Sequence, residues 1–325
     1  MAITPEQHSA ALANLYPEAA AAIAGWAPGR LEARAARPHS SQAICVSVFE
    51  TIGLRPAATR EAVLKDLLTL AGIGLDALHG VEIETEVREH RGVLNEIGGG
   101  TPTALDGLVW WPSGVMTIES KFTEQEFGGC SQVRPSKVPA SDQRFDPGEP
   151  TKGFANCTGR HEVGSDLKPI TRPLEAACRL TVRDRNRRPR LYWDLAPELF
   201  NPDVYELGRP CPFCGDRYQL MRNISFAYKW ARDRDLPHFA FMVMLVDSAP
   251  ASDKMRSAVE KVRGLLLREH RSRLGVISYE QLADVLEHRH GEKSLADWTR
   301  QRIADVCAGD AARCQTDPAF TRPNS

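Results

Sequence analysis

The alternation of hydrophobic and polar positions predicts a group of strands in the middle of the chain. Residues 81–90 read VEIETEVREH, where apolar or β-branched positions alternate with charged ones, as in a half-buried strand. ALDGLVWW (104–111) and GVMTIESKF (114–122) predict two more strands, joined by the turn signal Pro112-Ser113-Gly114. HFAFMVMLVD (238–247) is almost continuously apolar, which indicates a strand buried on both faces.

Helical patterns lie on both sides of these strands. On the N-terminal side we expect one over 4–25 with a break at Pro17, one over 42–53 capped by Ser40 or Ser41, and one from a Thr59 cap to about Ala71. On the C-terminal side the pattern predicts helices over 216–234, 252–270, 279–288 and 294–307. Helices, then a meander of strands, then helix, strand and helix predict an α/β fold with a mixed sheet.

Composition narrows the class of protein. The 325 residues are 42% hydrophobic and 26% charged, as in ordinary globular domains. The net charge of -1 argues against a protein that coats nucleic acid, although it allows a local basic groove. The chain has neither an apolar run of about 20 residues nor a basic start typical of a signal peptide. We therefore expect a cytoplasmic protein with eight cysteines, in which clustered cysteines serve metal binding or catalysis rather than disulfides, while Cys45, Cys307 and Cys314 are structural or incidental.

Two acids and a lysine carry the candidate chemistry. Glu119 and Lys121 are two apart and share a strand face, and a two-residue turn would place Asp106 opposite one of them. A three-residue turn would instead pair Asp106 with Ser120 and put its side chain on the other face, unless a bulge corrects the register. Two carboxylates with the Ser120 carbonyl between them suit Mg²⁺ or Mn²⁺. Such an ion activates water for phosphodiester hydrolysis, and a lysine stabilises the developing charge. The alternative is a structural ion pair on a solvated sheet face.

The stretch LDGLVWWPSGVMTIESKFTEQEFG resembles the core motif of the PD-(D/E)XK nuclease superfamily, although Leu105 stands where a proline is usual. The resemblance implies a restriction-endonuclease-like fold: a mixed sheet flanked by helices. It implies that Asp106 and Glu119 are metal ligands and that Lys121 is the catalytic lysine. It also points to Glu50, near the end of a preceding helix, as a further metal ligand, with Glu84 and Glu86 as weaker candidates.

The helix over 216–234 places Gln219 and Asn223 on one face. It is similar to the Q-x-x-x-Y helix of the RecB-like branch of the superfamily, with Asn223 in place of the tyrosine. That resemblance implies that the polar pair contacts DNA and braces the lysine, and Arg222 adds a candidate phosphate contact. The alternative is an ordinary amphipathic helix, which is compatible with this role.

Cys211-Pro-Phe-Cys214 has the spacing of a metal half-site. Two further cysteines would complete it, taken from Cys130, Cys157 and Cys178, with His161 as another option. The resemblance to RecB-like nucleases implies either structural Zn²⁺ or a [4Fe–4S] cluster, and the cysteine spacing differs from the usual pattern of that cluster. The alternative is a set of buried thiols.

The stretch RPLEAACRLTVRDRNRRPR over 172–190 has seven arginines against two acids. Beside a phosphodiesterase site, such a segment is expected to grip a DNA backbone, and Arg185, Arg187 and Arg188 are its candidate contacts. A solvated loop is the alternative.

Together these features predict an irregular Cys- and Arg-rich insertion over about 128–190 in a nuclease domain spanning 39–308. A helical extension over 1–38 precedes this domain, and a flexible tail over 309–325 follows it. The predicted function is a metal-dependent DNA endonuclease in restriction, defence or repair. A catalytically silent nucleic-acid-binding module with a zinc knuckle and an RNA nuclease are the alternatives. DNA, a second copy of the chain and companion restriction or defence subunits are the expected partners, and no membrane is involved.

Overall fold

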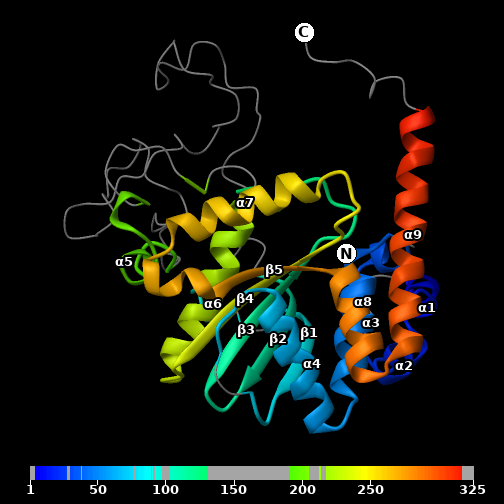
Figure 1. Ribbon diagram of the computed structural model, residues 1–325, viewed down its shortest axis with the longest axis horizontal. Helices are drawn as coiled ribbons and strands as arrows, with labels where there is room; N and C mark the ends of the chain where they lie inside the picture. The colour runs from blue at the N-terminus through cyan, green and yellow to red at the C-terminus, as the bar shows by residue number, and fades with distance from the viewer. Residues whose placement is uncertain are drawn as a thin grey trace.

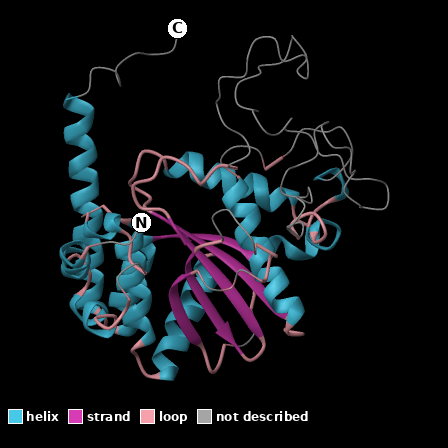
Figure 2. Cartoon of the chain, turned by 180° about the vertical axis from the view of Figure 1, so that it is seen from behind, coloured by secondary structure: helices cyan, strands magenta, loops and turns pink. Residues whose placement is uncertain are grey.

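A computed structural model describes residues 4–27, 30–37, 39–75, 78–88, 90, 92–96, 103–130, 191–204, 212–213 and 217–316. Within this part of the chain the sheet has five strands in the order β1-β2-β3-β4-β5 (Figure 2). The first three form an antiparallel meander, and β4 and β5 continue parallel to β3. The strands are β1 (Glu82–Val87), β2 (Leu105–Trp111), β3 (Gly114–Ser120), β4 (His238–Leu245) and β5 (Leu274–Ser278).

Helices cover both faces of the sheet (Figure 1). One face packs against α3 (Ser41–Gly53), α4 (Ala57–Leu70), α8 (Tyr279–His290) and α9 (Lys293–Thr316). The other face packs against α5 (Ala196–Leu199), α6 (Tyr218–Asp233) and α7 (Ser252–Leu265). At the N-terminus, α1 (Pro5–Ala13), α2 (Pro17–Ala22) and the 3-10 helix η1 (Ala33–Ala36) contact each other and α3. Two short 3-10 helices, η2 (Pro202–Val204) and η3 (Arg268–Arg273), complete the described elements.

The mixed α/β sheet predicted from the sequence is confirmed, and so is its central strand. β4 lies between β3 and β5 and is buried along nearly its whole length, because helices cover both of its faces. The turn between β2 and β3 has two residues, since Trp111 pairs with Gly114. This is the turn length that brings Asp106 opposite Glu119.

Four expectations about the elements were wrong. The short strand β5 was not predicted, and α4 begins at Ala57 after Pro56, before the expected Thr59 cap. α9 continues to Thr316, beyond the expected end near residue 307. The strict alternation of β1 also breaks, because Glu86 has a φ of 55°. Beyond that residue Val87 packs on the α6 side, whereas Val81 packs on the α3 side.

Among the described helices, none combines the length and the apolar content that crossing a membrane requires.

We expect Gly275→Ala to destabilise the fold. Gly275 lies in β5, and an added Cβ would clash with the Ala71 carbonyl oxygen and lie 2.8 Å from the Ala71 Cβ. Overpacking against a backbone atom costs roughly 1–3 kcal/mol, which urea unfolding measures as a lower midpoint. Gly264→Ala is the matched control, because nothing lies within 4 Å of a Cβ at that helical position. The control should be neutral or stabilising by up to about 1 kcal/mol. Equal midpoints for the two variants would contradict the packing described here.

Candidate active site

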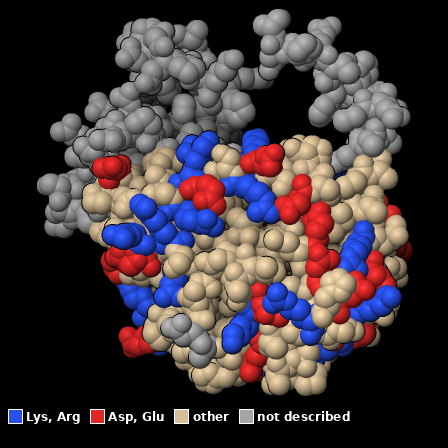
Figure 3. Space-filling view, in the orientation of Figure 1, with Lys and Arg blue, Asp and Glu red and all other residues tan. Residues whose placement is uncertain are grey.

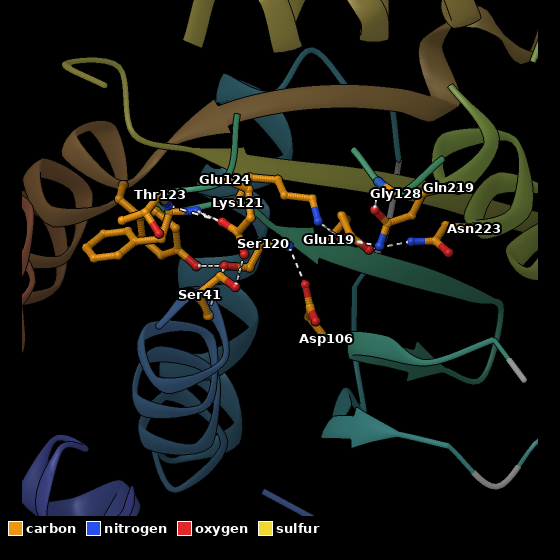
Figure 4. A network of polar contacts seen from close by, with 12 residues as sticks. Ser41, Asp106, Glu119, Ser120, Lys121, Thr123, Glu124, Gly128, Gln219 and Asn223 are labelled. Carbon is orange, nitrogen blue, oxygen red and sulfur yellow. Dashed lines mark hydrogen bonds and ion pairs between the residues drawn. The ribbon is translucent and has the colours of Figure 1, made fainter. Parts of the chain in front are cut away.

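The end of the β2–β3 hairpin brings the predicted acids together. The register that pairs Gly107 with Ile118 continues so that Asp106 lies opposite Glu119. The backbone N–H of Ser120 donates to the Asp106 carboxylate at 2.7 Å (Figure 4). The side chain of Asp106 therefore ties the end of β2 to the end of β3.

Three donors surround the carboxylate of Glu119 (Figure 4). The Lys121 Nζ lies 2.8 Å from Oε1, which also accepts from the Gln219 amide at 2.5 Å. The Asn223 amide donates to Oε2 at 2.7 Å. Glu119 and Lys121 are 1% and 8% exposed, so these contacts replace the water that a buried carboxylate would otherwise require.

Gln219 and Asn223 reach one carboxylate because they are four residues apart on α6, which packs against this face of the sheet. Gln219 also accepts the backbone N–H of Gly128 at 2.7 Å. It thus joins the segment after β3 to α6. Gln219 and Asn223 act on the same residue, as a pair on one helix face would, but that residue is Glu119 and not the expected Lys121.

A second layer of contacts, absent from the sequence predictions, lies on the α3 side. The Ser120 hydroxyl donates to the Ser41 carbonyl at 3.2 Å and lies 2.6 Å from the Tyr279 hydroxyl. The Glu124 carboxylate accepts the Ser41 hydroxyl at 2.5 Å and the Phe122 backbone N–H at 2.8 Å. The acidic TEQEF segment is the signal in the sequence from which Glu124 could have been identified. These contacts hold the start of α3 and the end of β3 together.

Crowded negative charge perturbs the titration of this cluster. Burial, followed by the nearby Glu119 and Glu86 carboxylates, raises the pKa of Asp106 well above its usual range. Burial opposes the charge of Lys121, but the Glu119, Glu124 and Asp106 carboxylates outweigh it and raise the pKa of the ammonium. Lys121 is therefore cationic at neutral pH and acts as a hydrogen-bond donor.

Among the described residues, no hydrogen bond or ion pair joins Glu50 to the Asp106–Glu119 pair. Its carboxylate accepts the Thr85 hydroxyl at 2.5 Å, so this residue braces β1 against α3. Glu86 is instead the third acid that acts on Asp106. It is 6% exposed, and its Oε1 has no hydrogen-bond partner. Its positive φ follows from no pattern in the sequence.

The donors fit a hard divalent cation. The Asp106 and Glu119 carboxylates and the Ser120 carbonyl are oxygen ligands of the type that Mg²⁺ and Mn²⁺ prefer. The raised pKa of Asp106 indicates excess negative charge that a cation would neutralise. Within the described residues, no three acid, histidine or cysteine side chains converge to hold an ion by themselves. Backbone oxygen and water would therefore complete the ligand set.

The structure describes two of the other predicted site residues, Arg222 and Cys130. Arg222 is half-buried, with its guanidinium 5.9 Å from the Tyr218 ring centroid. Cys130 is half-buried against the core on the α6 side. Cys178, Cys211, Cys214, Arg185, Arg187 and Arg188 lie outside the described residues, so the zinc, iron–sulfur and arginine-loop hypotheses stay predictions.

A mixed five-stranded sheet flanked by helices, with an acid opposite an E-x-K strand at its end, defines a restriction-endonuclease-like protein. A family model described as "Restriction Endonuclease associating with ARP" matches residues 32–302. The chain belongs to this family, which implies a nuclease and hence a hydrolase. Searches of curated proteins and of solved structures found no match.

We expect Glu86 to make the metal-free fold less stable as pH rises. Burial raises the pKa of this carboxyl to about 7. The folded state therefore binds more protons than the unfolded state between about pH 4.5 and 7, and stability falls across that window. In EDTA, the free energy of unfolding of the wild type should fall by on the order of 3 kcal/mol between pH 5 and pH 8, as measured by urea unfolding. Glu86→Gln should not show this fall, because glutamine does not ionise. Glu82→Gln, an exposed acid on the same strand, is the control. Identical pH dependence in wild type and Glu86→Gln would refute the assignment.

Proposed function

We propose that the protein is a metal-dependent endonuclease that hydrolyses phosphodiester bonds in DNA. The observation that carries the proposal is the convergence of Asp106, Glu119 and Lys121 at the end of the β2–β3 hairpin. Asp106, Glu119 and the Ser120 carbonyl would hold Mg²⁺ or Mn²⁺. Such an ion, when bound, polarises a phosphoryl oxygen and lowers the pKa of water.

Lys121 would orient the attacking water and stabilise the negative charge that develops on the phosphate. Its raised pKa supports this role, because a lysine that stays cationic donates hydrogen bonds and does not act as a base. Its placement also supports the role. The ammonium lies 2.8 Å from a proposed metal ligand, within reach of a phosphate bound there.

Gln219 and Asn223 would act as positioning residues. Their amide groups hold both oxygens of Glu119 but are neutral, so the negative charge of Glu119 remains to attract a cation. Asn223 is fully buried, so its side chain acts on Glu119 and does not contact DNA directly. Gln219 is half-buried and lies closer to the surface.

DNA would be the substrate, and a companion protein is proposed as a partner, because the family is named for its association with ARP. A catalytically silent nucleic-acid-binding module is the second candidate function. The observation in its favour is that Glu119 already accepts three donors, one of them the lysine that would serve catalysis.

We expect Lys121→Met to abolish hydrolysis with little loss of fold, because methionine keeps most of the buried volume of lysine. Plasmid cleavage in Mg²⁺ should fall at least about 100-fold. Lys65→Met is the matched control, since Lys65 is exposed on α4, away from the cluster. Thermal melts establish that both variants fold.

Unchanged cleavage by Lys121→Met would place hydrolysis elsewhere in the protein. A wild type that binds DNA without cutting it would support the silent module. RNA of matched sequence, offered in parallel, distinguishes a ribonuclease from a deoxyribonuclease.

A further inference from the structure

The segment that comprises α7 and η3 concentrates positive charge. Residues 252–273 carry seven Lys or Arg against three Asp or Glu, although the chain as a whole has a net charge of -1. In Figure 3, blue side chains gather over the part of the surface where Figure 1 shows α7. This local excess produces a positive potential that the overall composition conceals.

Several of these cations are not neutralised. Within the described residues, no ion pair joins an acid to Lys261, Arg268 or Arg271, and all three are exposed. The Arg271 guanidinium donates to the Leu266 carbonyl at 3.3 Å, which orients the side chain and keeps its charge. We call these three residues the basic patch.

The basic patch is connected to the candidate active site through α7. That helix packs with α6 on the face of the sheet that carries Glu119. Near the start of α7, Lys254 pairs with Glu126, which lies in the segment that follows β3. Lys254 and Lys261 are two helical turns apart and share one side of the helix, about 10 Å from each other along its axis. An extended ligand on α7 would therefore span from the patch toward the cluster.

The chemistry of the patch favours a polyanion. Protein interfaces usually bury an apolar centre, but among the described residues the exposed large hydrophobic side chains are Leu54 and Leu70. Leu54 follows α3 and Leu70 ends α4, and both helices lie on the opposite face of the sheet. Exposed guanidinium and ammonium groups, in a segment where no large hydrophobic side chain is exposed, match the regularly spaced phosphates of a duplex.

We propose that Lys261, Arg268 and Arg271 bind the phosphate backbone of duplex DNA and direct the duplex toward Asp106 and Glu119. This inference rests on the proposed function and adds to it a binding surface separate from the arginine-rich stretch. The patch contacts backbone and not base edges, so it adds affinity without sequence preference.

The test is binding of a fluorescent 20-base-pair duplex in EDTA, measured by anisotropy across a salt series. The triple variant Lys261→Gln/Arg268→Gln/Arg271→Gln should lower the slope of log affinity against log salt by about 2–3. Its affinity at about 0.15 M salt should fall roughly 10-fold or more.

The control Lys65→Gln/Arg289→Gln/Lys293→Gln removes equal charge from α4, α8 and α9 and should bind as wild type does. The double variant Lys261→Gln/Arg268→Gln, which spares the Arg271 contacts, should show about two thirds of the slope change.

The outcomes separate this inference from the proposed function. Binding lost equally in the patch and control variants would overturn the inference, as would a slope unchanged in the patch variants or a wild type that binds no duplex. A patch variant that binds DNA normally but no longer captures an acidic protein partner would reassign the surface to protein. Patch-dependent binding by a wild type that never cuts in Mg²⁺ would support the docking surface and refute the nuclease.

Discussion

The buried carboxylate of Glu119 is the constraint on which the rest of the site depends. A charge with almost no contact with water must be satisfied by protein groups, and here the donors come from β3 itself and from α6. Satisfying that one carboxylate fixes where α6 begins against the sheet and where Lys121 lies. Through Gln219 it also fixes the segment that leaves β3. The same contacts therefore stabilise the fold and assemble the candidate chemistry.

The cluster concentrates negative charge in a buried place, which lowers the stability of the metal-free protein when its acids are ionised. Asp106 and Glu86 add negative charge beside Glu119, and Lys121 is the nearby cation that opposes the shift in Asp106. A carboxyl whose pKa is raised in the folded state binds its proton more tightly there than in the unfolded state. The metal-free protein therefore becomes less stable as pH rises and these acids ionise. A bound divalent ion would reverse that effect, which is the usual relation between a strained site and its ligand.

The sequence predicted the parts of this site that depend on local spacing. Two-residue periodicity placed Glu119 and Lys121 on one face, and helical spacing paired Gln219 with Asn223. The position of Asp106 depended on the turn length, which the sequence left open and the two-residue turn of the structure decides. Interactions between distant elements did not follow, such as the contact of Ser120 with Tyr279. The five residues of β5 are too few to separate a strand from a loop by periodicity, and the positive φ of Glu86 contradicts the preference of its own residue type.

We propose that Asp106, Glu119 and the Ser120 carbonyl form one divalent-metal site. Anomalous diffraction from crystals grown with Mn²⁺ tests it most directly, because it locates the ion without reference to activity. We expect an anomalous peak at about 2.2 Å from both carboxylates and from the Ser120 oxygen. Saturating Mn²⁺ with no peak there, and with Glu119 still bound only to Lys121, Gln219 and Asn223, would contradict it.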